Sequence, residues 1–200
     1  RGQIPSDYAS REGQAYWLLS VGHETGSKDF NGDTLLLWAV KQRSVATVEW
    51  LLARGYDPNT TDSEDNTPLI NAISSGYQDI TRILLNGGAS LNTKNNLGFP
   101  PLVLAAHNGH YSIVKLLLDE GVDIEQIGPL AGRTALFEAA HKQRADVVRL
   151  LLSRGADFTY RDREGWTVLA LASVRNFSTG IVQQLVEAGA DVNDAANPSN

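Results

Sequence analysis

Residues 100–121 read PPLVLAAHNGHYSIVKLLLDEG, and this stretch predicts two short helices separated by a break. Proline suits the first turn of a helix, so the first helix is expected at Pro101–Asn108. Gly109 can adopt the left-handed conformation that ends a helix, and the apolar spacing over Tyr111–Asp119 predicts the second helix. The stretch is therefore expected to fold as a helix–turn–helix unit.

The same pattern recurs along the chain with a nearly fixed period. A glycine follows each apolar run, and successive glycines lie 33, 33, 34 and 34 residues apart, at Gly55, Gly88, Gly121, Gly155 and Gly189. A second register is set by five marker residues, Thr34, Thr67, Pro100, Thr134 and Thr167. Each marker is followed two residues later by Leu and five residues later by Ala. Two registers with one period indicate a repeat architecture, in which each unit buries its apolar face against the next.

Several segments resemble the signature of the ankyrin repeat family. They are Thr67-Pro68-Leu69, Gly109-His110, Ile113-Val114-Lys115-Leu116-Leu117-Leu118 and Gly189-Ala190-Asp191-Val192-Asn193. The resemblance covers about residues 29–193 and implies an elongated all-α solenoid of stacked helix-turn-helix units with projecting β-turn fingers. Trp17-Leu18-Leu19 stands 33 residues before Trp50-Leu51-Leu52, so a half-repeat with a capping helix is expected to precede the repeats.

The predicted organisation is one capping segment, five ankyrin repeats and a disordered tail. The segments are 1–28 for the cap, 29–61, 62–94, 95–128, 129–161 and 162–194 for the repeats, and 195–200 for the tail. The chain departs from the family pattern at the helix break, where Arg43 and Gln143 replace the preferred glycine. The last repeat has one extra residue between its helices, so local helix bounds are expected to be less regular there.

Composition argues against several other classes of protein. The net charge of -6 opposes a general nucleic-acid binder, which carries a basic excess. The absence of cysteine excludes disulfides and thiolate zinc sites, and no apolar run is long enough to predict a membrane-spanning helix. The chain starts at Arg1 and contains no Met, so we expect it to be part of a longer protein.

The resemblance implies that contacts come from the fingers and from the exposed side of the first helices, which line a concave face. Aromatic residues at these positions are expected to be the anchors, because they give large contact area for little side-chain entropy. The predicted contact residues are Phe30, Asp33, Trp38, Asn66, Asn71, Phe99, Leu104, His107, Arg133, Glu138, His141, Lys142, Trp166 and Arg175. Exposed Leu97 and Leu130 on neighbouring fingers would strengthen this hypothesis.

Two alternatives remain open for these residues. The aromatic side chains can instead pack onto an adjacent finger and never contact another molecule. The basic residues of the fourth and fifth repeats can form a patch for an acidic or phosphate-bearing molecule, or a solvated face of mixed charge. These residues are Arg133, His141, Lys142, Arg144 and Arg175, and the interleaved acids are Glu138, Asp146, Asp162 and Glu164.

The predicted function is recognition of a protein or peptide by a monomeric, non-enzymatic module in the cytoplasm or nucleus. No cofactor, metal, nucleic acid or membrane is expected to take part. The alternative is a small-molecule-binding or atypical enzymatic domain with a concave pocket around His107, Glu138 and His141. First helices of adjacent repeats lie about 8–10 Å apart, so the two imidazoles are not expected to meet on one metal ion.

Overall fold

The computed structural model describes residues 28, 32–175 and 178–193, and this part of the chain contains ten α-helices. They are α2 (Leu35–Lys41), α3 (Val45–Leu52), α4 (Pro68–Ser74), α5 (Gln78–Asn86), α6 (Pro101–Asn108), α7 (Tyr111–Asp119), α8 (Ala135–His141), α9 (Ala145–Ser153), α10 (Val168–Arg175) and α11 (Thr179–Glu187). They fall into two compact units, an N-terminal unit that ends at Asn96 and a C-terminal unit that begins at Leu97. The capping segment, Phe30 and the tail lie outside the described residues.

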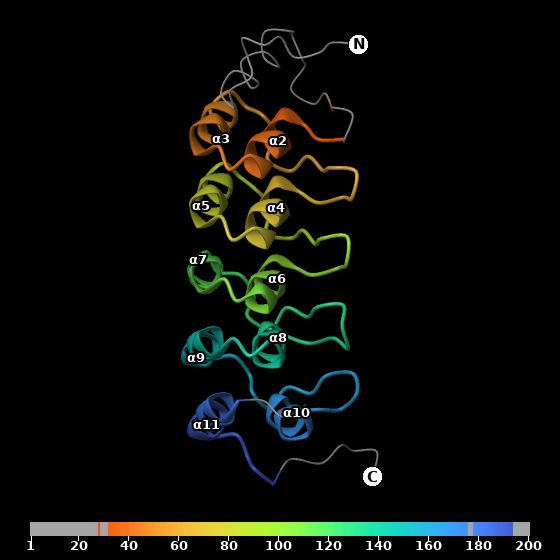
Figure 1. The fold of residues 1–200 in the computed structure, drawn as a ribbon, viewed down its shortest axis with the longest axis vertical. Helices are drawn as coiled ribbons and strands as arrows, with labels where there is room; N and C mark the ends of the chain where they lie inside the picture. Colours follow the sequence, from red (N-terminus) through yellow and green to blue (C-terminus); the bar gives the residue numbers. More distant parts are fainter. Residues whose placement is uncertain (1–27, 29–31, 176–177, 194–200) are drawn as a thin grey trace. The chain divides into compact units, whose positions relative to one another are not determined.

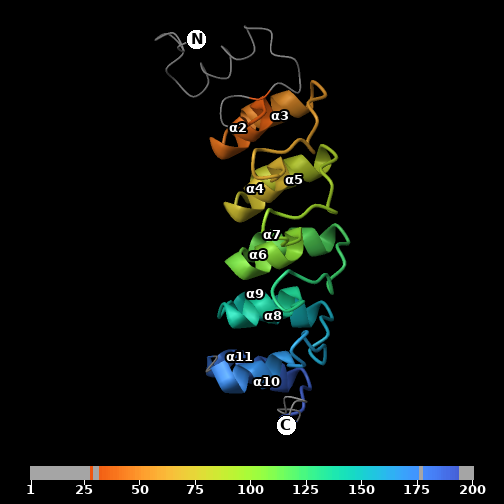
Figure 2. The same cartoon turned by 90° about the vertical axis from the view of Figure 1, so that its right-hand side faces the viewer.

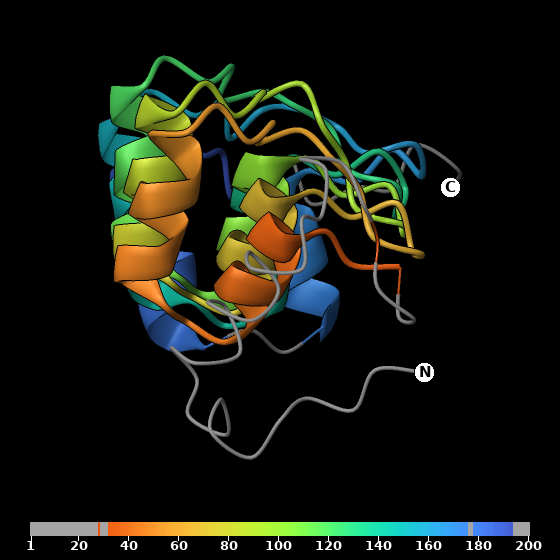
Figure 3. The same cartoon turned by 90° about the horizontal axis from the view of Figure 1, so that it is seen from above.

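Each unit is built from pairs of antiparallel helices that stack on like pairs. In the N-terminal unit α2 packs on α4 and α3 on α5. In the C-terminal unit the first helices α6, α8 and α10 form one column, and the second helices α7, α9 and α11 form another (Figure 1). Within each unit the first helices lie between the second helices and the projecting loops (Figure 3). The predicted all-α class is confirmed for the described residues.

Three of the first helices, α2, α4 and α10, begin directly after marker threonines whose side chains cap them. The hydroxyl oxygens of Thr34, Thr67 and Thr167 accept hydrogen bonds from backbone N–H groups three residues later, at 3.4, 3.3 and 3.2 Å. This satisfies one of the N–H groups that the first turn of a helix leaves without an acceptor. Pro68 and Pro101 stand at the first helical position, where their missing N–H costs nothing.

The core consists of alanines and large apolar side chains of the first helices, such as Leu36 and Phe137, together with the branched side chains of the second helices. Ala39, Ala72, Ala105 and Ala139 have no exposed surface, as expected where first helices approach closely. The second helices bury one stripe of Val, Leu and Ile, such as Ile113, Val114 and Leu117 of α7. Stacking therefore buries an apolar face that a single helix pair would leave in water.

The break between the helices of a pair is a left-handed turn, with φ of 73° at Gly76 and 81° at Gly109. The predicted bounds of α6 and α7 around Gly109 are confirmed. Arg43 and Gln143 occupy the same register with φ of 54° and 59°, so the turn persists without glycine. A left-handed residue with a Cβ costs about 1–2 kcal/mol, which the packing of the flanking helices offsets.

The loops that project from each unit, called fingers here, are residues 53–67, 87–100, 120–134 and 154–167. Backbone hydrogen bonds close their bends, from Asp62 N–H to the Asn66 carbonyl and from Asp162 N–H to the Trp166 carbonyl. Neighbouring fingers of one unit are also linked, because the Asn59 side-chain oxygen accepts the Ser90 N–H at 2.8 Å. The division of the chain into five repeats with the stated bounds remains a prediction.

Candidate interaction surface

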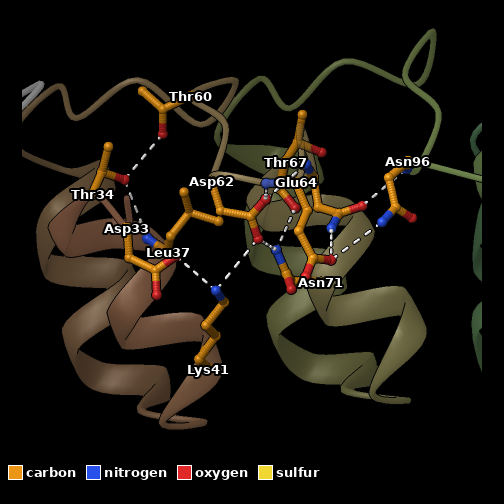
Figure 4. A network of polar contacts seen from close by, with 11 residues as sticks. Asp33, Thr34, Leu37, Lys41, Thr60, Asp62, Glu64, Thr67, Asn71 and Asn96 are labelled. Atoms are coloured by element: carbon orange, nitrogen blue, oxygen red, sulfur yellow. Dashed lines mark hydrogen bonds and ion pairs between the residues drawn. The ribbon is translucent and has the colours of Figure 1, made fainter. Parts of the chain in front are cut away.

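A polar network joins the first helix and the fingers of the N-terminal unit (Figure 4). The ammonium of Lys41, at the end of α2, lies 2.6 Å from the carboxylate of Asp33 and 3.3 Å from that of Asp62. Both aspartates are buried, whereas the Lys41 side chain is 37% exposed. Burial alone would lower the pKa of Lys41, but hydrogen bonds to the two carboxylates and their charges together raise it. Lys41 therefore stays charged and links the segment directly before α2 to the finger of residues 53–67.

Asp62 also organises its own finger. Its Oδ1 accepts the backbone N–H groups of Glu64 and Asn66, each at 2.9 Å, and its Oδ2 accepts the Asn71 side-chain amide at 3.3 Å. Burial acts to raise the pKa of Asp62, but these hydrogen bonds and the charge of Lys41 outweigh it and lower the pKa. Three predicted contact residues, Asp33, Asn66 and Asn71, thus belong to a network that fixes the backbone around them.

The C-terminal unit contains an equivalent polar network around Asp162, in which the cation is an arginine instead of a lysine. Oδ1 of Asp162 accepts the N–H groups of Glu164 and Trp166, each at 3.0 Å. Oδ2 of Asp162 accepts the Nε–H of Arg133 at 3.1 Å, and both side chains are buried. Arg133, predicted to contact a partner, is therefore a buried structural cation.

His107 and Glu138 meet across α6 and α8. Nδ1 of His107 lies 2.8 Å from Oε2 of Glu138, and Glu138 is only 1% exposed. The Phe99 ring packs edge-on against the His107 ring with their centroids 5.2 Å apart. Phe99 is 6% exposed. Of the two alternatives for the aromatic side chains, packing within the fold therefore applies to Phe99. Leu104 is buried as well.

His141, one turn after Glu138 on α8, is half-buried and lies in a field of mixed charge. Burial lowers its pKa; Glu138 acts to raise it, and Arg133, Lys142 and Arg175 lower it further. The imidazole is therefore held toward its neutral form. The structure brings His107 and Glu138 together, and within the described residues no group of three His, Asp or Glu side chains is arranged to hold a metal ion.

Eight of the predicted contact residues keep at least partly accessible side chains, and Asn66, Asn71, His107 and His141 among them are half-buried. Trp38 and Trp166 are half-buried, and Lys142 and Arg175 are exposed. The described helices include none that is long and apolar enough to cross a membrane.

The three-copy family model for ankyrin repeats matches residues 7–95, 36–128 and 102–196. The chain belongs to the ankyrin repeat family. No curated protein sequence matches it. Ankyrin repeat domains are protein–protein interaction modules, so the coarse class of function follows from the family.

Two solved ankyrin repeat structures are similar to most of the chain. The ankyrin repeat domain of Bcl-3, described as a unique member of the IkappaB protein family, is 27% identical with a TM-score of 0.80, covering 89% of this chain and 79% of that one. An ankyrin repeat domain from Acinetobacter baumannii AYE is 31% identical with a TM-score of 0.79, covering 88% of this chain and 91% of that one. These neighbours support the ankyrin fold expected from the sequence.

Sequence reasoning missed the hydrogen bonds between neighbouring ankyrin fingers, in which a side chain of one finger accepts a backbone N–H of the next. Glu125 accepts the Asp157 N–H at 2.8 Å, as Asn59 does with Ser90. Asn59 and Glu125 each stand four residues after a repeat glycine, Gly55 and Gly121. That shared offset, together with a side chain that can accept a hydrogen bond, was the available signal.

Proposed function

We propose that this chain recognises a protein or peptide through its fingers and the exposed side of its first helices, without catalysing a reaction. The observation that carries the proposal is an apolar patch on two neighbouring fingers of the C-terminal unit. This fingertip patch consists of Leu97, Pro129 and Leu130. Its side chains face solvent, whereas most other exposed residues of the fingers are polar, charged or glycine.

Close approach of the two fingers makes the patch continuous. Gly98 has a φ of 86°, and a Cβ built on it would lie 3.3 Å from the Pro129 Cβ. Leu97 and Leu130 flank this contact and are 67% and 50% exposed. Single exposed leucines are common on soluble proteins, but adjacent ones on projecting loops favour a binding surface.

Each unit also has one accessible tryptophan among the predicted contact residues. Trp166 lies on the last finger of the C-terminal unit and Trp38 on α2 of the N-terminal unit, and both are half-buried. Partly exposed tryptophan on a fixed backbone is typical of binding hot spots. The buried contact candidates Asp33, Phe99 and Arg133 are assigned to holding that backbone in place.

The chemistry of the chain favours a protein partner over the other classes. The net charge of -6 disfavours nucleic acid. In the alternative pocket around His107, Glu138 and His141, the Glu138 carboxylate is 1% exposed and lies 2.8 Å from the His107 ring, so we assign it to orienting that imidazole. A monomer in the cytoplasm or nucleus is the setting that we infer for this function.

The test is affinity capture from a matched lysate with three folded forms of the chain. The first is wild type, the second is Leu97→Ser/Leu130→Ser, and the third is the control Tyr111→Ser/Val186→Ser. The control residues are exposed apolar side chains of the second helices α7 and α11, at 42% and 40%. Both variants therefore remove similar apolar area from the C-terminal unit.

Proteins retained by wild type and by the control, but lost with the fingertip variant, would support recognition through the fingers. Equal retention by all three forms would refute it. A metabolite screen that found a small ligand whose affinity depends on Glu138→Gln would favour the pocket alternative instead.

A further inference from the structure

Two of the three first helices of the C-terminal unit, α8 and α10, end beside exposed cations. Lys142 directly follows α8, and Arg175 is the last residue of the neighbouring helix α10 (Figure 2). Each of these cations stands eight residues after the marker residue of its repeat. Both side chains are exposed, and among the described residues neither makes an ion pair. Val174, beside Arg175, is 62% exposed and adds apolar surface at the same place.

Two of the acids that could neutralise these cations are committed elsewhere. Glu138 is buried and bound to His107, and Asp162 is buried and bound to Arg133 and to its own finger. Charge interleaving along the sequence predicted a solvated face of mixed sign, with Glu138 and Asp162 as half of its acids. Arg133 is buried together with these two carboxylates, so the exposed charges of this set are three cations and two acids, which leaves a small basic excess.

The charged side chains that act on His141 are also mostly cations. Of the four charged side chains that act on its pKa, three are the cations Arg133, Lys142 and Arg175, and only Glu138 opposes them. The three cations come from the preceding finger, from the end of α8 and from the end of α10. Because α8 and α10 pack against each other, Lys142 and Arg175 stand at neighbouring helix ends.

In the N-terminal unit, a cation at the end of a first helix is paired with buried carboxylates. Lys41, seven residues after its marker, holds two buried carboxylates at 2.6 and 3.3 Å. Gln42 and Ser75 stand at the eight-residue offset there and carry no charge. Arg144, the remaining basic residue nearby, donates to the His107 carbonyl at 3.5 Å and lies across Gly109. Within the described part of the chain, Lys142 and Arg175 form no comparable ion pair.

We propose that Lys142 and Arg175 bind carboxylates of an acidic segment of the partner protein, with Val174 packing against an apolar side chain of that segment. The inference rests on the proposed function and names the chemistry of its partner. Two exposed cations on adjacent helices match two acidic side chains of one extended segment, whose alternate side chains lie on the same side. The binding is expected to weaken with salt because both cations face solvent.

The experiment titrates two labelled peptides onto the full chain. One is a short peptide of Glu with interspersed Leu, and the other has every Glu replaced by Gln. The chain is used as wild type, as Lys142→Glu/Arg175→Glu, and as the control Arg82→Glu/Arg149→Glu. The control reverses two exposed cations on the second helices α5 and α9 and therefore changes the net charge equally.

Wild type and control are expected to bind the Glu peptide with similar affinity, and wild type to bind the Gln peptide less tightly. Lys142→Glu/Arg175→Glu should lower affinity for the Glu peptide by about tenfold or more, since two attractions become repulsions. The milder pair Lys142→Gln/Arg175→Gln should lose less. Circular dichroism establishes that each variant is folded.

Equal losses in the two charge-reversed variants would overturn the proposal, because net charge alone would then explain binding. The proposal would also be overturned if the wild-type chain bound the two peptides with equal affinity, or if it bound vesicles containing phosphatidylserine in preference to the Glu peptide. Proteins captured through Leu97 and Leu130 would still support the proposed function in each of these cases, so the two failures are distinguishable.

Discussion

Asp62 and Asp162 test how far the exposure of a cation determines the energy of its ion pair. Both carboxylates are buried, both occupy the fifth position before a marker residue, and both accept two backbone N–H groups. They differ in their cation: the Lys41 side chain is 37% exposed, and that of Arg133 is 10% exposed. Substitution by Asn keeps the shape and the acceptor oxygen but removes the charge.

The expected cost differs because the two cations are left in different surroundings. Removing one member of a buried ion pair costs about 3–5 kcal/mol, whereas an exposed pair is worth about 0–1 kcal/mol. After Asp62→Asn, Lys41 keeps Asp33 at 2.6 Å and retains access to water. We therefore expect Asp162→Asn to lower the free energy of unfolding by about 3 kcal/mol and Asp62→Asn by about 1 kcal/mol.

Urea denaturation followed by circular dichroism measures the loss, and amide hydrogen exchange localises it. Exchange should accelerate at the Glu164 and Trp166 N–H groups in Asp162→Asn, because they donate to Asp162. Asp157→Asn, on an exposed carboxylate of the same finger, should change stability by less than about 1 kcal/mol. Equal losses for Asp62→Asn and Asp162→Asn would refute the reasoning that burial of the cation sets the cost.

Three further measurements probe the turn, the imidazole and the core of the C-terminal unit. Gln143→Val should destabilise by about 1–2 kcal/mol, because a β-branched residue is strained at a φ of 59°, while Gln143→Gly should be close to neutral in urea denaturation. The pKa of His141 is lowered in the folded chain, so the unfolded chain takes up more protons as pH falls below about 6.5 and wild type loses stability. Urea midpoints at acid and neutral pH should show a smaller loss for His141→Gln, and an equal loss would contradict this assignment. Phe137→Ala should cost about 3–5 kcal/mol by the same assay, because the ring is 1% exposed, and a cost below about 1 kcal/mol would contradict its core role.

Local signals were enough to predict the helices. Pro101 and Gly109 fix where α6 begins and ends through the conformations of their own backbones, so the bounds of α6 follow from neighbouring residues in the sequence. The buried alanines follow equally from the period, because a repeated small residue implies a repeated close contact.

The direction of a side chain on a finger was not predictable in this way. Phe99 and Trp166 both stand one residue before a marker, yet Phe99 is buried against His107 and Trp166 is half-buried. The residue that covers Phe99 comes from α6, and the one that pairs with Arg133 comes from the next finger, so each outcome depends on a neighbouring element. An offset from a marker gives a backbone position but not the neighbour that the side chain meets.

The same dependence explains why charge counted along the sequence left two alternatives open for the basic residues of the last two predicted repeats. Arg133 and Lys142 lie nine residues apart, but Arg133 meets a buried carboxylate and Lys142 meets solvent. A cation with an internal carboxylate contributes to stability, and a cation without one is available to another molecule. Substitution separates the two roles: Arg133→Gln should lower stability and Lys142→Gln should lower binding. If Lys142→Gln destabilised the fold as much as Arg133→Gln, the exposed ends of α8 and α10 would be structural, and recognition would rest on the fingertip patch alone.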